Sequence, residues 1–551
     1  MQKGCELLIQ SLESKGVEYI FGIPGAKVDS VFNALVDSPI HLVLCRHEQN
    51  AAFMAAAYGR LTGKPGVVLV TSGPGVSNLA TGLLTATTEG DPIVAIGANV
   101  PRNMLLTQSH QCAHNTELMQ GATKSSVEMT TADVIPAAIA NAFRTALEPR
   151  RGAAFISIPQ DVLLENTLAT PLKCSRGPIQ RGAAPHEVIN QAAEAIKGAK
   201  SPLLLVGMES SQPDVAQAIR SLLKEYPLPT IGTYQGAGAL GEEAASLFFG
   251  RVGLFRNQKG DQLIEESDLI ITIGYDAVEY DPEIWNPSPH KKTIIHIDSL
   301  PSNLHAAYSP SLELIGDLPL TLNGLTSQLH NHKRHVLKKK ENEKQELEQE
   351  IEKGKAYSGT PIHPLRFIYE LYQHVDEKTT ICCDIGSLYI WMARHFFCFH
   401  PHQLLFSNGQ QTLGVALPWA MASRYVFPKD HQIFSMSGDG GFLFSAMELE
   451  TAVREKIHFI HFIWQDGSYN MVAEQEEMKY HRTSGISLGE LSIPDFARGF
   501  GALGLELQDP KDFSSILRDA QAFPGPVLIN VPIDYRDNPA LFQTIDPHHG
   551  H

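Results

Sequence analysis

Short apolar runs alternate with longer segments of helical periodicity along most of the chain. The runs expected to form strands are residues 67–70, 93–96, 154–158, 203–206, 269–273, 293–297, 380–383, 433–436, 459–464 and 527–531. Continuous apolar runs are typical of strands whose two faces are both covered, and helix-length connections are typical of parallel sheets. The pattern therefore predicts an α/β chain with several doubly wound sheets.

Two segments interrupt this pattern and are expected to separate domains. Residues 173–185 are rich in Pro, Gly and Arg, and residues 331–359 contain a long charge run that is typical of a solvated linker helix. A chain of 551 residues has room for about three domains. We expect three doubly wound α/β domains, at residues 1–170, 186–328 and 358–540.

Composition narrows the classes of function. The formal charge is −16, which disfavours binding to nucleic acid or to an anionic membrane. The seven cysteines form no CxxC pair, so a disulfide framework or a zinc site is not expected, and a reducing compartment fits. The first 16 residues have the pattern of an amphipathic helix, and no apolar run reaches the length of a membrane span. We therefore expect a cytoplasmic protein.

The strongest candidate for chemistry is the segment from residue 431 to residue 471. Gly438-Asp439-Gly440-Gly441 follows one predicted strand, and Asp466 follows the next, 27 residues after Asp439. The carboxyl ends of parallel strands meet at one sheet edge, so the two aspartates are expected to converge there. Two carboxylates and a loop carbonyl suit Mg²⁺ or Ca²⁺, and the glycine amides at a helix start suit an anion. The helix after the turn is expected to have Met447, Leu449 and Val453 on its apolar side.

A lone GDG is more often an ordinary turn, but the second strand-end aspartate favours a metal–diphosphate site. The segment resembles the thiamine-diphosphate motif, which opens with GDG and closes at this distance with a pair usually written NN; here the pair is Gln465-Asp466. Runs such as FGIPGAK, RHEQNAAFMAAAYGRLTGKPG, NGQQTLGVALPWA, MELETAV and VPIDYRDNP extend the resemblance over essentially the whole chain. They are similar to the thiamine-diphosphate-dependent acetohydroxyacid synthase family, in particular its catabolic acetolactate synthases.

The resemblance implies roles for individual residues. Asp439, Asp466 and the main-chain carbonyl of Ser468 would hold Mg²⁺, and Glu48 would hydrogen-bond the aminopyrimidine ring of thiamine diphosphate. The residues implied in catalysis are Glu48, Gln111, Lys27 and Gln475. Those implied in cofactor binding are Gly25, Ser72, Gly73, Pro74, Asn78, Gly386, Ser387, Gln410, Gln411, Leu413, Gly438, Asp439, Gly440, Gly441, Asp466, Ser468, Tyr469, Asn470 and Met471. Leu413 would take the place of the bulky residue under the bend of the cofactor. Leu388 and Tyr389 depart from the polar pattern expected beside the diphosphate.

The middle block raises two other cofactors. Residues 236–241 match GxGxxG, but Pro229 and Gly232 interrupt the preceding apolar run, and no acidic strand end follows at the spacing of a dinucleotide site. Biosynthetic members of the family carry a structural FAD beside an Arg-Phe-Asp-Asp-Arg stretch. Here residues 274–280 read GYDAVEY, without arginines. We expect neither NAD nor FAD.

The resemblance implies three domains, pyrimidine-binding, central and diphosphate-binding, with each active site shared between subunits of a homodimer or homotetramer. The implied reaction removes carbon dioxide from pyruvate and joins the remaining unit to a second pyruvate, giving 2-acetolactate. Residues 112–121 depart from the family pattern beside Gln111, so another acceptor, or release of an aldehyde, stays an alternative. A scaffold that has lost catalysis is a further alternative, which the presence of Glu48, Asp439 and Asp466 disfavours.

Overall fold

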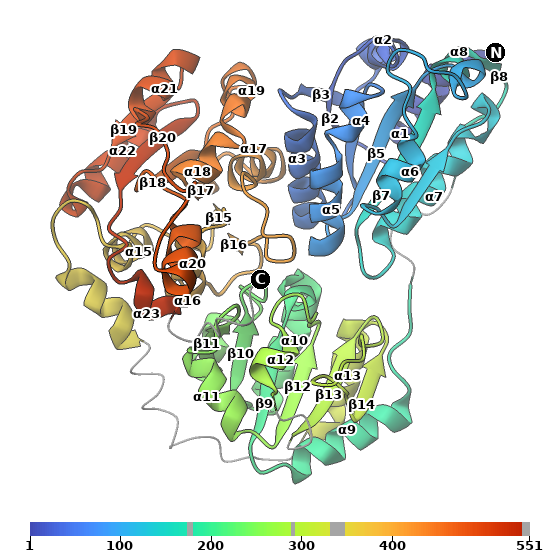
Figure 1. The fold of residues 1–551 in the computed structure, drawn as a ribbon. Helices are drawn as coiled ribbons and strands as arrows, with labels where there is room; N and C mark the ends of the chain where they lie inside the picture. The colour runs from blue at the N-terminus through green and yellow to red at the C-terminus, as the bar shows by residue number, and fades with distance from the viewer. Residues whose placement is uncertain (174–179, 288–291, 331–347, 543–551) are drawn as a thin grey trace.

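Three six-stranded parallel sheets, each in its own domain, organise the chain (Figure 1). The computed structural model describes residues 1–173, 180–287, 292–330 and 348–542. Helices lie on the faces of the sheets, which confirms the predicted α/β class with three doubly wound domains. In the described part of the chain, no helix is both long enough and apolar enough to cross a membrane.

The N-terminal domain has the strand order β3-β2-β4-β5-β7-β6. Its strands are β2 Tyr19–Ile23, β3 His41–Leu44, β4 Gly66–Val70, β5 Ile93–Asn99, β6 Ser125–Glu128 and β7 Ala153–Pro159. Its helices are α1 Gly4–Ser14, α2 Asp29–Ala34, α3 Glu48–Thr62, α4 Pro74–Ser77, α5 Ala80–Glu89, α6 Asn115–Gln120, α7 Ile135–Leu147 and α8 Gln160–Leu164. A two-stranded antiparallel pair, β1 Gln2–Lys3 with β8 Asn166–Thr167, ties the chain start to the end of the domain.

The central domain has the strand order β11-β10-β9-β12-β13-β14. Its strands are β9 Pro202–Val206, β10 Thr230–Thr233, β11 Phe248–Val252, β12 Leu269–Ile273, β13 Thr293–Asp298 and β14 Leu312–Ile315. Its helices are α9 His186–Gly198, α10 Pro213–Glu225, α11 Lys259–Glu266, α12 Pro282–Trp285 and α13 Leu318–Leu329. Every residue of β9 and β12 is buried, as expected for central strands covered on both faces.

The C-terminal domain has the strand order β16-β15-β17-β18-β20-β19. Its strands are β15 Thr379–Cys383, β16 Leu404–Leu405, β17 Gln432–Gly438, β18 Ile460–Gln465, β19 Leu503–Glu506 and β20 Val527–Pro532. Its helices are α15 Pro364–Tyr372, α16 Ser387–His395, α17 Ala416–Val426, α18 Asp439–Leu443, α19 Leu449–Arg454, α20 Asn470–Tyr480, α21 Ile493–Phe500, α22 Phe513–Ala522 and α23 Asn538–Phe542. A 3₁₀ turn, η8 Ala446–Glu448, separates α18 from α19.

The N- and C-terminal domains meet through helices α3 and α17, which face each other between the two sheets (Figure 1). The face of α3 consists of small residues with Phe53 and Met54 among them, and it shares one hydrophobic core with α17. The Arg60 guanidinium lies 4.5 Å from the centre of the Trp419 ring across this contact. The two sheets are thereby set side by side within one chain.

Each apolar run expected to be a strand does form one, but some finer expectations were wrong. Gly232 does not end its strand; it lies inside β10, where the register against β11 shifts. The segment after the GDG turn is not one helix: it breaks into α18, η8 and α19, so Leu449 is buried while Met447 is 38% exposed. Most of the expected linker helix, residues 331–347, lies outside the described residues, and residues 348–352 are helical.

Candidate active site

Strands β17 and β18 deliver two aspartates to one edge of the C-terminal sheet. Asp439 begins α18 directly after β17, and Asp466 follows β18. The Asp439 carboxylate accepts hydrogen bonds of 2.8 Å from the backbone N–H of Gly440 and from that of Gly467. Burial raises the pKa of Asp439, and burial together with the nearby Asp439 charge raises the pKa of Asp466 to about 6. Two acids that resist being charged together are suited to a cation.

A cavity of about 300 Å³ opens beside these aspartates. The expected cofactor residues that line it are Gly386, Ser387, Gln411, Leu413, Gly438, Asp439, Gly440, Gly441, Asp466, Ser468, Tyr469, Asn470 and Met471. Gln475, expected to act on the substrate, also lines it. The structure thus brings together side chains that are spread over about ninety residues of sequence.

Sequence reasoning gave no individual role to the apolar side chains of this cavity wall. Leu254 and Phe255 from the central domain, Ile385, Val472 and Tyr535 also line it. Leu254 and Phe255 end the run GRVGLF, and Tyr535 lies in VPIDYRDNP; both runs belong to the family resemblance, which gives these side chains no role. Leu388 lines the cavity as well, whereas Tyr389 is fully buried and donates a hydrogen bond to Asn408, so it takes no part in the cavity wall.

The turn at residues 438–441 requires glycine for close packing. A Cβ atom on Gly440 would lie 2.5 Å from the Tyr469 ring, and one on Gly441 would lie 3.0 Å from Asp384 Oδ2. Helices α16 and α20 begin at Ser387 and Asn470 on the same cavity wall. Helix starts present unpaired N–H groups and partial positive charge, so this wall suits a phosphate group.

Hydrogen bonds fix the loops around the cavity. Ser387 Oγ donates to Asn470 Oδ1 over 2.7 Å, which ties the starts of α16 and α20 together. The buried carboxylate of Asp384 accepts from the Gly414 N–H at 3.0 Å, and burial raises the pKa of this carboxyl to about 7. This contact holds the loop that places Gln411 and Leu413 on the wall.

The donor set fits Mg²⁺ bound together with a diphosphate. Among the described residues, no group of three or more His, Cys, Asp or Glu side chains is arranged to hold a metal ion. The carboxylate pair therefore needs further oxygen ligands from a main-chain carbonyl, phosphate or water. Mg²⁺ commonly binds through one or two carboxylates plus phosphate oxygens and water. The glycine turn and the helix starts could hold such a phosphate.

A second group of expected residues gathers in the N-terminal domain. Glu48 is the first residue of α3 and is 9% exposed, and Asn78 Nδ2 donates to its Oε2 over 2.9 Å. Gln111 lies against the loop after β4: its side chain is 3.2 Å from a Cβ built on Gly73, and Ser72 Oγ donates to Gln111 Oε1 over 3.5 Å. Both Gly73 and Gln111 have positive φ angles, of 62° and 60°.

Gly25 and Pro74 frame the same group. A Cβ on Gly25 would lie 2.5 Å from Thr71, so the turn after β2 packs closely on the loop after β4. Pro74 is the first residue of α4. The Thr71 hydroxyl is buried with no hydrogen-bond partner in the described chain, a polar atom that a ring nitrogen or amine could satisfy.

Within one chain, the residues around Glu48 do not reach the cavity beside Asp439. No residue of the N-terminal domain is among those that line the cavity beside Asp439. Lys27 lies half-buried in the turn after β2, and Gln410 is exposed; neither contributes to the cavity wall.

The central domain shows no dinucleotide arrangement at residues 236–241. The chain turns after β10 and continues into a 3₁₀ helix, Glu242–Leu247, rather than an α-helix whose start would face a pyrophosphate. Within residues 274–280 the two tyrosine rings are buried: Tyr275 and Tyr280 are at most 2% exposed, and Trp285 Nε1 donates to the Tyr275 hydroxyl over 3.0 Å. Asp276 forms an ion pair with Arg150 of the N-terminal domain.

Comparison with known proteins agrees with this geometry. Family models described as the thiamine pyrophosphate enzyme N-terminal TPP binding domain, central domain and C-terminal TPP binding domain match residues 2–120, 189–325 and 384–531. The chain is 48% identical to "Acetolactate synthase" of Bacillus subtilis (strain 168), over 97% of this chain and 94% of that protein. It is 43% identical to "Acetolactate synthase, catabolic" of Raoultella terrigena, over 98% and 96%. Identity to "Acetolactate synthase isozyme 2 large subunit" of Escherichia coli (strain K12) is 28%, over 97% and 96%.

Proposed function

Because the chain belongs to the acetolactate synthase family of thiamine pyrophosphate enzymes, we propose that it joins two pyruvate molecules into 2-acetolactate with release of carbon dioxide. The observation that carries this proposal is the pair of strand-end aspartates beside a glycine turn and a cavity, in a chain that matches acetolactate synthases over nearly its full length. Thiamine diphosphate, when bound, supplies an electron sink for the bond that breaks as carbon dioxide leaves.

Residues of the C-terminal domain would hold the diphosphate end of the cofactor. Asp439, Asp466 and the Ser468 carbonyl would bind Mg²⁺, and the N–H groups of the glycine turn and of the α16 and α20 helix starts would bind phosphate oxygens. Leu413 would support the bend between the two rings. The evidence for these roles is that all of them line one cavity.

Residues of the N-terminal domain would act on the aminopyrimidine ring. Glu48 would accept a hydrogen bond from the protonated ring nitrogen and so hold the proton there. Gln111 and Lys27 would lie toward the substrate, where a cation and an amide can orient the carboxylate of pyruvate.

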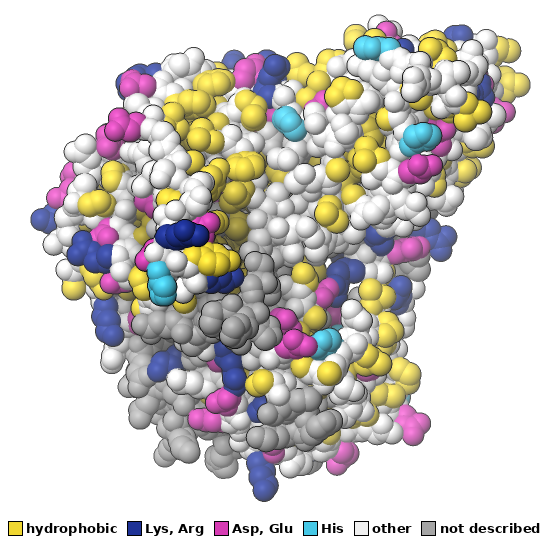
Figure 2. Space-filling model, in the orientation of Figure 1, with side chains coloured by type: hydrophobic (Ala, Val, Ile, Leu, Met, Phe, Trp, Pro, Cys, Tyr) yellow, Lys and Arg dark blue, Asp and Glu magenta, His cyan; other side chains and the backbone are white. Residues whose placement is uncertain are grey.

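We propose that each site forms between two copies of the chain, in a homodimer or homotetramer. The Asp439 cavity lacks any wall from the N-terminal domain of its own chain. Hydrophobic side chains form a band down the front of the C-terminal domain (Figure 2). Exposed hydrophobic side chains of this domain include Leu443, Phe444 and Met447 in the segment after the GDG turn, and Val472, which lines the cavity. An apolar surface of this kind is typical of an interface, and a second N-terminal domain placed there would complete the site.

The decisive experiment is an assay with pyruvate, Mg²⁺ and thiamine diphosphate, in which acetolactate is measured as acetoin after acid treatment. We expect one acetolactate per carbon dioxide released, and no product without the cofactor. Acetaldehyde in place of acetolactate would instead identify a decarboxylase. A product formed only when a second 2-oxo acid or an aldehyde is added would identify another acceptor.

The Gln475→Ala variant should separate decarboxylation from ligation. Gln475 lies on α20 at the cavity wall, where its amide can hold the carboxylate of the second pyruvate. We expect carbon dioxide release to persist while the ratio of acetolactate to carbon dioxide falls about tenfold or more, with acetaldehyde rising. Glu477→Gln, an exposed neighbour on the same helix, is the control. An unchanged product ratio in Gln475→Ala would move the acceptor site to other residues, first to residues 112–121.

The purified protein should carry no flavin. Residues 274–280 lack the arginines of the FAD-binding relatives, and the buried rings of Tyr275, Tyr280 and Trp285 occupy the space beside β12. We expect no visible absorption from flavin and no flavin in the supernatant after denaturation. One flavin released per chain would contradict this.

A further inference from the structure

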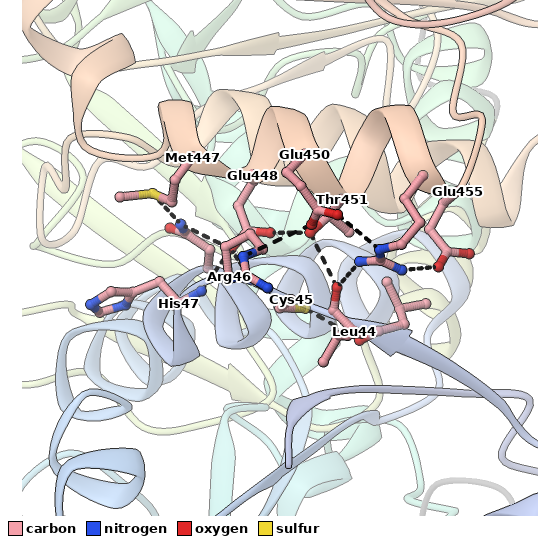
Figure 3. Close-up of polar contacts among 12 residues, drawn as sticks. Leu44, Cys45, Arg46, His47, Met447, Glu448, Glu450, Thr451 and Glu455 are labelled. Carbon is pink, nitrogen blue, oxygen red and sulfur yellow. Dashed lines mark hydrogen bonds and ion pairs between the residues drawn. The ribbon is translucent and has the colours of Figure 1, made fainter. Parts of the chain in front are cut away.

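A buried carboxylate of the C-terminal domain holds the backbone of the N-terminal domain next to Glu48. Glu448 lies in η8 and is 0% exposed. Its Oε1 accepts hydrogen bonds from the backbone N–H of Arg46 at 2.8 Å and from that of His47 at 2.9 Å. These are the two residues before Glu48, and Figure 3 shows the side chain of Glu448 reaching from the α18–α19 segment toward them.

Neighbouring contacts fix the same stretch of chain. Asn50 Nδ2, in the first turn of α3, donates to Glu448 Oε1 over 3.3 Å. Thr451 Oγ1 donates to Glu448 Oε2 over 2.9 Å and lies 3.1 Å from the carbonyl oxygen of Leu44, the last residue of β3. The whole connection from β3 into α3 is therefore held by the segment that follows the GDG turn (Figure 3).

The buried Glu448 carboxylate is satisfied by hydrogen bonds alone. Four donors surround the carboxylate, and none of them is a cation. Loss of the carboxylate would leave two partly buried backbone N–H groups without this acceptor, which favours movement of the 45–47 connection. Residue 48 follows without a break, so its side chain would move with that connection.

We propose that Glu448 is a positioning residue for Glu48, linking the chain segment that carries Asp439 to the segment that carries the aminopyrimidine carboxylate. Asp439 and Glu448 lie nine residues apart on the β17–β18 connection. If each site forms between two subunits, Glu48 and Asp439 of one chain belong to two different sites. Glu448 then connects these two sites within one chain. The inference rests on the proposed role of Glu48.

The first test uses the protein without cofactor. In Glu448→Ala, amide hydrogen exchange of a peptide covering residues 44–49 should become roughly tenfold faster or more, because the Arg46 and His47 N–H groups lose their acceptor. Glu450→Gln is the matched control: it removes the same charge from the same segment, but Glu450 contacts the side chains of Arg46 and Arg454 and not the backbone at 46–47. We expect wild-type exchange in the control.

The second test measures exchange of the C2 proton of thiamine diphosphate, per bound cofactor, at saturating cofactor. In Glu448→Ala we expect a decrease of roughly 10- to 100-fold, since a displacement of about 1 Å has effects of this size. Glu448→Gln keeps an oxygen toward Arg46 and His47 and should stay within about threefold of wild type in both tests. If Glu448→Ala does not fold, Glu448→Asp, whose carboxylate is withdrawn by about 1.5 Å, takes its place with the same expected decrease.

The outcomes separate this inference from the proposed function. If wild-type protein with cofactor and Mg²⁺ shows no fast C2 exchange, the role of Glu48 itself is wrong. If wild type exchanges and Glu448→Ala, or Glu448→Asp in its place, matches it per bound cofactor, Glu448 only holds the two domains together. If C2 exchange falls as much in Glu448→Gln as in Glu448→Ala, the effect comes from the charge of Glu448. That outcome would overturn positioning by hydrogen bonds.

Discussion

The Glu48→Gln variant is expected to keep its fold and most of its cofactor affinity, but to lose about 10²- to 10⁴-fold of turnover, the usual size of general acid–base catalysis. A glutamine retains an oxygen that can accept the hydrogen bond from Asn78, so the start of α3 should stay in place. It lacks the charge that stabilises a protonated ring nitrogen. The C2 proton exchange of bound thiamine diphosphate, followed by NMR in deuterated buffer, should fall by the same factor.

A matched control separates this role from an ordinary helix-start charge. Glu187 is also an acid in the first turn of its helix, α9, and it is exposed. If Glu48 only complemented the helix dipole, either substitution would cost roughly 0.3–1 kcal/mol of stability and leave C2 exchange unchanged. We expect that outcome for Glu187→Gln alone. Wild-type C2 exchange in Glu48→Gln would remove Glu48 from the chemistry.

The sequence predicts the central strands well because burial determines them. Strands such as β9 and β12 are apolar at nearly every position, since helices cover both of their faces. The strands that were not expected are short or lie toward sheet edges. β6, with the sequence SSVE, and β3, with HLVL, mix polar and apolar residues, because one side of each meets solvent. Local pattern carries little information about such strands.

The polar part of the candidate site was predictable for a different reason. Asp439 and Asp466 follow two predicted parallel strands, so topology alone places them at one edge. The apolar wall had no such signal. Leu254 and Phe255 reach the cavity from the central domain only because three domains pack together, and Leu254 has a φ of 54°, which no hydrophobic pattern encodes.

The hydrogen bonds from Glu448 to residues 46 and 47 could not be predicted from local sequence either. The run MELETAV is part of the family resemblance, but a glutamate between apolar residues is ordinary on a helix surface. Its partners are about four hundred positions away in sequence, at residues 46 and 47. Packing of the N-terminal domain on the C-terminal domain brings the two segments together, so tertiary packing and not local sequence gives this carboxylate its proposed role.

Asp439→Ala should abolish useful cofactor binding. In the proposed site Asp439 binds Mg²⁺ directly, and its carboxylate also joins the turn at residues 438–441 to the loop after β18 through Gly467. Mg²⁺ would bridge the protein and the diphosphate, and loss of one carboxylate ligand weakens the binding of that cation. We expect thiamine diphosphate affinity in the presence of Mg²⁺ to fall by about 100-fold or more, the upper end of what changes beside a metal usually cause. Titration calorimetry measures this directly.

Asp466→Asn sharpens the test, because the thiamine-diphosphate motif usually has Asn where this chain has Asp466. An amide oxygen can still bind Mg²⁺, and removing one charge also relieves repulsion between two acids, of which Asp466 has its pKa raised to about 6. Asp466→Asn should therefore bind the cofactor within about tenfold of wild type, whereas Asp439→Ala should bind it about 100-fold or more weakly. EDTA should reduce wild-type binding to the level of Asp439→Ala. Wild-type binding that is indifferent to EDTA would show that the aspartates hold no metal, and the diphosphate would then depend on the N–H groups of the glycine turn and of the α16 and α20 helix starts.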